Sequence, residues 1–415
     1  MKILVVHGRV RNLGDRAIAQ CMARQLRSAF PDCELVYDAD EPEAMREHLP
    51  DAKIVPSLVD VRRVKQVGRA YSWRYFWRNG PYLSLVAAKY LYFWACAVLG
   101  LGGSLVASVR EYRTADMVVW AGGDYVSDVY GLRFRLRLLE LHLAKMMGKT
   151  VVLYAMTVGP FRDQRSSLAT ARALSAADLV LARDQGTFDL LARAGVTANV
   201  RRTADCVLLL KPRTSPAALA AIERLGIDGR TIGFAPIAGL YVGLAQSDYQ
   251  AYEQGLAGLV RDAVAGGRRT VLIAATTEDL DQCRAMERKY GLGVGILDAL
   301  AFEPDEVKAI LGRFGLIVSS RMHPVIIGTG AGTPVLGINR LFKMKEYLAM
   351  IGLEKYHLPL APFDAARAKE LMAELEDRNA EVRGELAAGL ARAVALSESN
   401  IEHVRRLWAE RPGAA

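Results

Sequence analysis

The sequence is poor in cysteine, and the few cysteines are too scattered for a zinc site or a disulfide framework. An odd set of five in 415 residues is spread along the whole chain, and no two of them stand in the close pairs that bind zinc. They are Cys21, Cys33, Cys96, Cys206 and Cys283. This usage is typical of a protein in a reducing compartment. We therefore expect a cytoplasmic protein.

Export and cofactor motifs are lacking as well. The apolar run after Met1 is too short for a secretory signal and passes directly into a predicted strand. The paired glycines Gly122 and Gly123 lack the spacing of a dinucleotide fingerprint or a P-loop. There is no serine nucleophile elbow, and no cluster of histidines, cysteines and carboxylates at metal-ligand spacing. The sequence thus predicts a site without metal and without a bound cofactor.

The charge balance is basic. Lysine and arginine number 54 against 45 acidic residues, which gives a formal net charge of +9 and a pI of about 9.3. Such a balance favours anionic small molecules, anionic lipid surfaces or nucleic acid. No recognised nucleic-acid-binding module is present, so we expect no nucleic-acid partner.

Predicted strands and helices alternate in two series, which indicates two doubly wound sheets. Residues 1–212 form the first Rossmann-like half and residues 213–363 the second, with a hinge near Lys211 and Pro212. Residues 364–415 are rich in Ala, Glu, Arg and Leu and predict a helical tail. We therefore expect an α/β protein with two Rossmann-like domains facing a cleft, and C-terminal helices.

An aromatic and basic insertion at residues 56–113 interrupts the first series. Its 28 residues from Tyr82 to Val109 carry one charge, Lys89, and about 20 apolar residues suffice to span a bilayer. Lys89 and the glycines at 100, 102 and 103 argue against a span, so we expect an interfacial helix or helical hairpin whose flanking arginines face anionic lipid. The alternative is a buried core helix. The aromatic residues expected at headgroup depth are Trp73, Trp77, Tyr82, Tyr90, Tyr92, Phe93 and Trp94.

A polar cluster, SSRMH, follows a predicted buried strand at residues 316–318. In open α/β sheets, ligands bind at the carboxyl ends of the strands. Arg321 offers a planar fork for a carboxylate or phosphate, and His323 suits proton transfer near neutral pH. The alternative is a helix cap and a histidine satisfied in the core.

Two further cations follow other predicted strands. We expect Asp184 to cap the next helix and so leave Arg183 to face an anion, and Lys343 follows the strand in TPVLGIN. Arg183, Arg321 and Lys343 therefore all lie beyond strand carboxyl ends. We expect them to converge on one anion, which the site would bind by positive charge and convert by acid–base transfer.

The other strand-end motifs are NLGD, GGD and TVGP. Asp15 of NLGD is placed either to cap the following helix or to project into the cleft, and capping is the commoner fate of such an Asp. Glycines at strand ends let a ligand approach the backbone closely. We expect Asn12, Gly122, Gly123 and Gly159 to line the substrate site.

In order, NLGD, GGD with Asp128 downstream, TVGP, RD before a helix, SRMH, and GTPVLGIN with Lys343 resemble the successive motifs of the polysaccharide pyruvyltransferase family. The resemblance covers roughly residues 3–353. It implies a two-domain fold of the glycosyltransferase-B type. It also implies transfer of the pyruvyl group of phosphoenolpyruvate onto two sugar hydroxyls, which forms a cyclic ketal and releases phosphate.

The resemblance also implies roles for single residues. Arg321 and His323 would contact phosphoenolpyruvate, with His323 as the general acid. Arg183 and Lys343 would be further anion contacts. Asp15 would face the acceptor sugar and remove its hydroxyl proton.

The sequence departs from the family pattern at three positions. Asp124 stands where a third glycine is usual, and Arg16 stands where an acidic residue is common after the NLGD-type motif. His323 is followed by Pro324 in place of a small residue. The first two departures touch the half expected to bind the acceptor, so the family pattern indicates the donor more firmly than the acceptor.

The expected acceptor is a glycan or lipid-linked oligosaccharide at the cytosolic face of the plasma membrane, which would explain a peripheral membrane segment. Two other functions stay open at this point. One is a glycosyltransferase of the same fold that uses a nucleotide sugar, and the other is a non-catalytic subunit of a glycan-assembly complex.

Overall fold

The computed structural model describes residues 1–59, 73–239, 244–339 and 342–411, without the side chains of residues 73–78. The chain divides into two compact units. Unit 1 comprises Met1–Val10, Ile18–Asp205 and Ser399–Ala415, and unit 2 comprises Arg11–Ala17 and Cys206–Glu398. The division differs from the sequence-based boundaries mainly at two places. Residues 11–17 group with unit 2, and the last seventeen residues group with unit 1.

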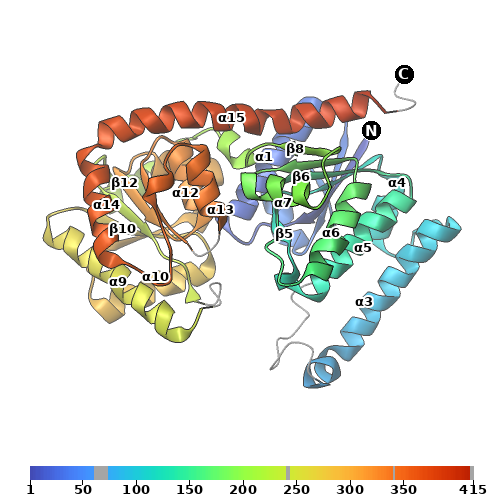
Figure 1. The fold of residues 1–415 in the computed structure, drawn as a ribbon, viewed down its shortest axis with the longest axis horizontal. Helices are drawn as coiled ribbons and strands as arrows, with labels where there is room; N and C mark the ends of the chain where they lie inside the picture. Colours follow the sequence, from blue (N-terminus) through green and yellow to red (C-terminus); the bar gives the residue numbers. More distant parts are fainter. Residues whose placement is uncertain (60–72, 240–243, 340–341, 412–415) are drawn as a thin grey trace. The chain divides into compact units, whose positions relative to one another are not determined.

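Unit 1 contains a parallel sheet in the order β3-β2-β1-β4-β6-β7-β8, with β5 paired to β6 (Figure 1). Its elements are β1 (Lys2–Gly8), α1 (Leu13–Ala29), β2 (Glu34–Ala39), α2 (Pro42–His48), β3 (Lys53–Pro56), α3 (Trp73–Leu99), α4 (Ala107–Thr114), β4 (Met117–Trp120), β5 (Gly123–Val126), α5 (Leu132–Met146), β6 (Thr150–Val158), α6 (Gln164–Ala176), β7 (Leu179–Ala182), α7 (Gln185–Arg193) and β8 (Val200–Arg202). The first residues of α1 belong to unit 2.

Unit 2 contains a second parallel sheet, in the order β11-β10-β9-β12-β13-β14. Its elements are α8 (Pro216–Leu225), β9 (Ile232–Ala235), α9 (Gln246–Ala265), β10 (Thr270–Ala274), α10 (Thr277–Tyr290), β11 (Gly295–Asp298), α11 (Pro304–Leu311), β12 (Leu316–Ser319), α12 (Met322–Gly330), β13 (Val335–Ile338), α13 (Phe342–Met350), β14 (His357–Leu358), α14 (Ala365–Asp377) and α15 (Asn379–Ala409). The end of α15 belongs to unit 1.

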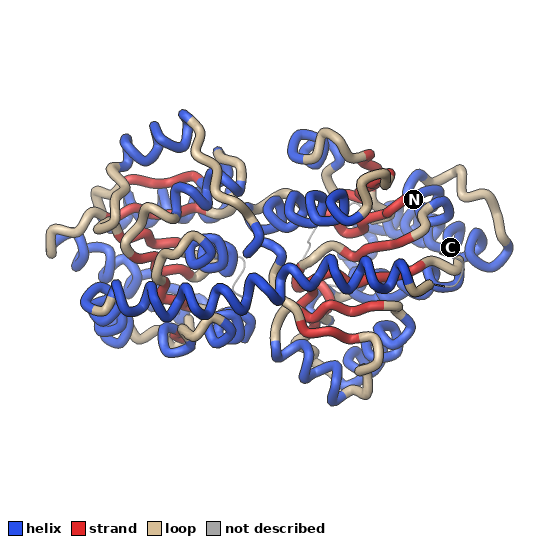
Figure 2. The backbone as a smooth tube through the Cα atoms, turned by 90° about the horizontal axis from the view of Figure 1, so that it is seen from above, coloured by secondary structure: helices blue, strands red, loops and turns tan. Residues whose placement is uncertain are grey.

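The strands are buried because they are apolar on both faces, as parallel strands covered by helices must be. Residues 3–6 of β1 and 316–318 of β12 expose 1% or less of their surface. Figure 2 shows the strands of each sheet enclosed by helices. The prediction of two parallel α/β sheets followed by C-terminal helices is confirmed.

Each sheet changes winding direction at one point. In unit 1 the chain runs from β1 outward to β3 and then returns to β4, on the other side of β1. In unit 2 it runs from β9 outward to β11 and returns to β12, on the other side of β9. Ligands in open α/β sheets bind at such switch points, outside the carboxyl ends of the strands. The loops after β1, β9 and β12 are therefore the expected ligand-binding loops.

One strand prediction was too long. The segment VRRTADCVLLL forms a strand only at β8 (Val200–Arg202) and then a 3-10 turn over Cys206–Leu209. Between the two, Asp205 accepts a hydrogen bond from Nη1 of Arg183 at 2.7 Å.

The described part of the aromatic insertion contains the long helix α3, which packs against α5 on the outside of unit 1, and most of the short helix α4 (Figure 1). Val86, Tyr90, Phe93 and Cys96 recur at helical spacing and are buried in the unit 1 core. The expectation that Tyr90 and Phe93 reach headgroup depth is therefore wrong, because that face of the helix packs in the core. The predicted placement of Trp73 and Trp77 lies outside the described side chains.

Candidate active site

The SSRMH motif lies at the winding switch of unit 2, between β12 and α12. Ser320 donates its backbone N–H to the carbonyl of Ala235 at the end of β9, 2.9 Å away, which fixes the loop to the neighbouring strand. The Ser319 side chain bonds both backbone groups of Arg321, accepting from its N–H at 3.1 Å and donating to its carbonyl at 2.8 Å. Arg321 is thus the N-cap residue of α12, and His323 lies in the first turn.

The Arg321 guanidinium is held by an acidic partner in the first turn of α10, which follows β10, two strands away from β12. Its Nη2 lies 2.5 Å from Oδ1 of Asp279 and 3.3 Å from Oγ1 of Thr276. The Asp279 side chain is fully buried and also accepts the backbone N–H of Ala238. Thr276 caps α10 by accepting the N–H of Asp279. Arg321 is therefore positioned by the α10 cap, with 17% of its side chain exposed.

The NLGD motif packs directly on the SRMH motif. Leu13 donates its N–H to the carbonyl of Ala275, 3.1 Å away, just after β10. Gly14 lies against the His323 ring, so closely that a Cβ at position 14 would be 1.8 Å from Nδ1 of His323. Only glycine leaves room for the imidazole in this place. The structure therefore brings two motifs more than 300 residues apart in the sequence into one site.

The other residues of this turn explain why it groups with unit 2. Asn12 caps α1 by accepting the Asp15 N–H at 2.8 Å, and its side-chain amide donates to Oδ2 of Asp15 at 2.8 Å. The capping residue is thus Asn12, and Asp15 is its partner. Arg16 donates to the carbonyls of Leu300 and Phe302 in unit 2. Asn12 and Asp15 were expected to belong to the N-terminal half, but their loop packs with unit 2 instead.

Lys343 is the second residue of α13, after the carboxyl end of β13, which pairs with β12. The nearby Asn339 donates its side-chain amide to the carbonyl of Ser320, 3.1 Å away. The carboxyl edge of the unit 2 sheet thus carries Asn12, Asp15, Arg321, His323 and Lys343 from three different segments of chain.

Arg183 lies in unit 1 and has an acidic partner of its own. Its Nη1 donates to Asp205 at 2.7 Å and its Nε to Thr157 at 2.8 Å, with both charged side chains buried. Asp184 caps α7 as expected, accepting the Thr187 N–H at 2.8 Å. The expectation that this cap would leave Arg183 to face an anion overlooked Asp205, which compensates the arginine's charge inside unit 1.

The predicted glycines also lie in unit 1. Gly122 follows β4 and donates its N–H to the Met22 sulfur at 3.3 Å, and Gly123 begins β5. Gly159 has a φ of +84°, which favours glycine, and it precedes a cis peptide bond to Pro160. Asp128 accepts the Arg162 N–H at 2.6 Å, so it anchors the loop after β6. Substrate contacts of these glycines stay a prediction.

The comparison with known families decides the classification. The model of the family described as "Polysaccharide pyruvyl transferase" matches residues 12–340, which is most of the chain. The chain belongs to the polysaccharide pyruvyl transferase family. The match begins at Asn12 and ends just before Lys343, so it contains both motifs that pack together in unit 2.

Solved structures similar to this pyruvyl transferase share its fold at low sequence identity. The UDP-GlcNAc 2-epimerase of Neisseria meningitidis matches with a TM-score of 0.61 at 13% identity, covering 98% of this chain and 100% of that one. A UDP-glucosyltransferase of Polygonum tinctorium matches with a TM-score of 0.60 at 12% identity, covering 99% of each. The sucrose-phosphate synthase of Thermosynechococcus elongatus matches at 0.56, with 13% identity and coverage of 99% and 98%. The fold is therefore of the glycosyltransferase-B type.

Sequence reasoning missed two residues of the pyruvyl transferase site. Asp279 was not singled out, although Thr276 three residues before it forms a T-x-x-D capping pattern directly after a buried strand. Gly14 was counted only as a turn residue within NLGD, and nothing in the sequence pairs it with His323. Among the described residues, no group of three or more histidines, cysteines and carboxylates could hold a metal ion.

Proposed function

We propose that this pyruvyl transferase moves the pyruvyl group of phosphoenolpyruvate onto two hydroxyls of a sugar in a surface-polysaccharide precursor. The product is a cyclic ketal, and phosphate is released. The observation that carries the proposal is the packing of Gly14 on His323, beside Arg321, at the winding switch of unit 2. This is the place where an open α/β sheet binds ligands, and it holds one cation and one group suited to proton transfer.

The proposed chemistry needs a proton donor and several positive groups. Protonation of the methylene carbon of phosphoenolpyruvate makes the adjacent carbon electrophilic, and a sugar hydroxyl attacks it. The bond to the phosphate oxygen then breaks, and the second hydroxyl closes the ketal as it loses its proton. We assign the proton donation to His323 and propose Asp15 as the base.

The donor's two anionic groups need cations and N–H donors. Phosphoenolpyruvate carries a carboxylate and a phosphate close together, and we assign their binding to Arg321 and Lys343, aided by the N-terminus of α12. The Arg321 side chain does not cap α12. Arg183 stays a proposed further contact, although in this structure its charge is paired with Asp205.

We expect phosphoenolpyruvate to stabilise the protein and Arg321→Gln to remove this effect. Binding at a hundredfold excess over the dissociation constant adds about 2.7 kcal/mol to the free energy of unfolding. Thermal unfolding with and without phosphoenolpyruvate measures it, each variant being compared with its own unliganded state. The shift should vanish in Arg321→Gln, because the planar cation is lost.

Arg288→Gln is the matched control, because Arg288 is an exposed arginine on α10 of the same unit. This variant should keep the full shift. If phosphoenolpyruvate leaves the wild-type protein unchanged and UDP-glucose stabilises it, pyruvyl transfer is excluded and transfer from a nucleotide sugar takes its place. If phosphoenolpyruvate still stabilised Arg321→Gln, the donor would not bind at the SRMH motif.

We further propose that the acceptor is lipid-linked and that α3 rests on the cytosolic face of the membrane. Residues Asn79–Leu99 are long and apolar enough to cross a bilayer by length and composition, and 22% of this stretch is buried. The face opposite the core exposes Leu85, Leu91, Trp94 and Val98, each at 45% or more. Lys89 donates to the carbonyl of Leu58 in unit 1, 3.2 Å away. The other face of α3 packs in the unit 1 core. We therefore expect α3 to lie in the membrane–water interface and not to cross the bilayer.

Replacing Leu91 and Trp94 together by glutamine should weaken binding to anionic vesicles at least about tenfold. Burying one large apolar side chain contributes roughly 1.5–3 kcal/mol, and about 1.4 kcal/mol corresponds to a factor of ten. Cosedimentation with phosphatidylserine-containing vesicles measures the change. Leu219→Gln, at a similarly exposed leucine of unit 2, should bind as the wild type does. Equal sedimentation of all three proteins would contradict the membrane contact.

A further inference from the structure

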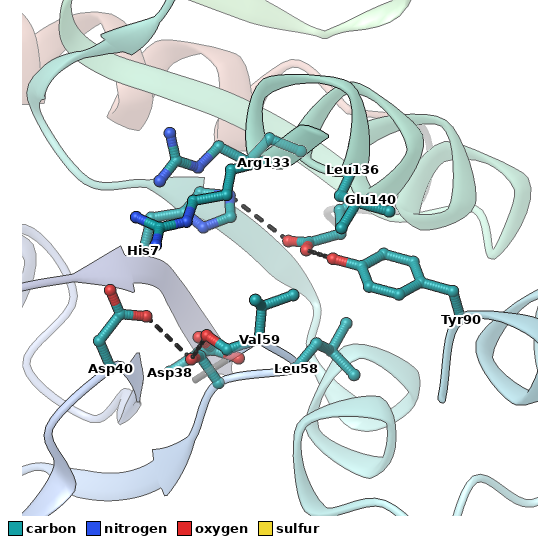
Figure 3. A pocket seen from close by; sticks show the side chains of 11 residues that line it. His7, Asp38, Asp40, Leu58, Val59, Tyr90, Arg133, Leu136 and Glu140 are labelled. Carbon is teal, nitrogen blue, oxygen red and sulfur yellow. Dashed lines mark hydrogen bonds and ion pairs between the residues drawn. The ribbon is translucent and has the colours of Figure 1, made fainter. Parts of the chain in front are cut away.

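Unit 1 contains a polar pocket that the proposed donor site does not use. It lies at the carboxyl ends of β1, β2 and β3, with an empty volume of about 350 Å³ including its open mouth (Figure 3). His7 comes from β1, Asp38 and Asp40 from the end of β2, Ser57 from the loop after β3, and Glu140 from α5. This is next to the winding switch of unit 1, where an open α/β sheet binds a ligand.

His7 is held in an unusual conformation at the centre of this pocket. Its φ of +63° lies in the left-handed region, which non-glycine residues adopt rarely and often at functional sites. Its side chain is nine-tenths buried, and its ring packs edge-on against Trp120, with centroids 4.9 Å apart. Among the described residues, Nε2 of His7 makes no hydrogen bond, and its nearest acidic neighbour is Oε2 of Glu140 at 3.4 Å. A buried polar atom that makes no hydrogen bond within the protein is expected to bond to a ligand or an ordered water.

The carboxyl groups around His7 are firmly positioned. Glu140 accepts hydrogen bonds from the hydroxyls of Tyr90 and Tyr112, and in Figure 3 its carboxylate lies between Tyr90 and the His7 ring. Asp38 accepts from Ser108 at 2.9 Å, and Asp40 accepts from Ser57 at 2.9 Å. Because these contacts come from the protein core, the pocket is built in advance of any ligand.

The charge of the pocket favours a neutral ligand. Arg133 and Arg137 also line it, so its three carboxyl groups are balanced in part by two guanidinium groups, and the described residues form no metal site. Burial raises the pKa of Glu140 to about 7, raises the pKa of Asp38 well above its usual range, and lowers that of His7 well below its usual range. Near neutral pH, the imidazole is thus uncharged. Groups that both donate and accept hydrogen bonds, beside apolar Leu58 and Leu136, match a sugar ring with its hydroxyls.

We propose that this pocket binds two neighbouring hydroxyls of the acceptor sugar, through His7 on one side and Asp38 and Asp40 on the other. The inference rests on the proposed function, because it supplies the acceptor subsite of that reaction. It names a neutral hexopyranose as the class of ligand. It makes His7 a binding residue in unit 1, separate from His323 in unit 2.

Saturation-transfer NMR on the full chain tests this with the methyl glycosides of glucose, galactose and mannose as probes. At least one probe should receive saturation from the wild-type protein. His7→Asn and Asp40→Asn should each weaken its binding about tenfold, the effect of losing one hydrogen bond in a buried site. Asparagine tolerates the left-handed backbone at position 7, and Asp40 is partly exposed, so both variants should fold.

Asp51→Asn is the control, because Asp51 is an acid of unit 1 with 82% of its side chain exposed. It should bind the probe as the wild type does. Phosphoenolpyruvate should stabilise all three variants equally, since its proposed site lies in unit 2. Unchanged sugar binding in His7→Asn and Asp40→Asn, or no binding of any probe to the wild type, overturns the inference. If phosphoenolpyruvate did not stabilise the wild-type protein, the proposed function would be overturned instead.

Discussion

Gly14→Ala should lower the rate of pyruvyl transfer about 10²- to 10⁴-fold, as much as removing the general acid itself. The reason is steric. A Cβ at position 14 would lie 1.8 Å from Nδ1 and 2.1 Å from Cγ of His323, so the imidazole must leave its place. The substitution changes no charge and removes no hydrogen-bonding group. Phosphate release from phosphoenolpyruvate in the presence of a glycan acceptor measures the rate.

Gly258→Ala is the matched control. Gly258 also lies in a helix, α9 of unit 2, and no atom lies within 4 Å of the Cβ that alanine would add. Alanine is favoured over glycine inside a helix by about 1 kcal/mol, so this variant should be at least as stable as the wild type and fully active.

His323→Asn provides the second comparison for this prediction. It should show the same loss of rate as Gly14→Ala, and the double variant should be little worse than either single one, because both remove the same group. If Gly14→Ala kept more than a tenth of the activity, the steric prediction would fail, and if His323→Asn did so, the assignment of His323 as the acid would fail.

The sequence was sufficient to place most candidate residues at the ends of strands. Apolar runs such as residues 316–318 predict buried parallel strands, and the polar residues that follow them must lie at the carboxyl edge of the sheet. This local reasoning located Arg321, His323 and Lys343 correctly on their elements. It works because the periodicity of a strand and the position of its end are properties of a few consecutive residues.

The sequence was insufficient for partners that come from distant segments. Arg321 was expected to face an anion, yet its nearest acid is Asp279, from the cap of α10. Arg183 likewise pairs with Asp205. The grouping of Asn12 with unit 2 goes with contacts to distant segments, Gly14 on His323 and Arg16 on the carbonyls of Leu300 and Phe302, which have no signature in the sequence motifs. Such pairings are set by the packing of whole elements and become visible only in three dimensions.

The same limit applied to the pocket around His7. The sequence analysis singled out neither His7 nor Glu140. The two are 133 positions apart, and their approach to 3.4 Å depends on how α5 packs on the sheet. Their burial, which shifts the pKa of each, depends on that packing too.

Arg321→Gln should lower the free energy of unfolding of unit 2 by about 3–5 kcal/mol, the usual cost of breaking a buried ion pair. The loss arises because Asp279, which is fully buried, would lose the cation that pairs with its Oδ1. Urea unfolding followed by circular dichroism reports on both units. Tryptophan fluorescence reports on unit 1, because all five tryptophans belong to that unit. The transition seen by circular dichroism should therefore shift more than the one seen by fluorescence.

Lys369→Gln is the control, because Lys369 pairs with Asp262 at 2.6 Å in the same unit but with more than half of each side chain exposed. An exposed pair contributes up to about 1 kcal/mol, so this variant should lose little stability. Adding Asp279→Asn to Arg321→Gln should restore part of the lost stability, because no charge is then left buried. If the double variant were less stable than Arg321→Gln alone, Asp279 would matter through its bond to the Ala238 N–H and not through the arginine. Arg321, the cation proposed to bind phosphoenolpyruvate, would then be positioned mainly by contacts other than Asp279.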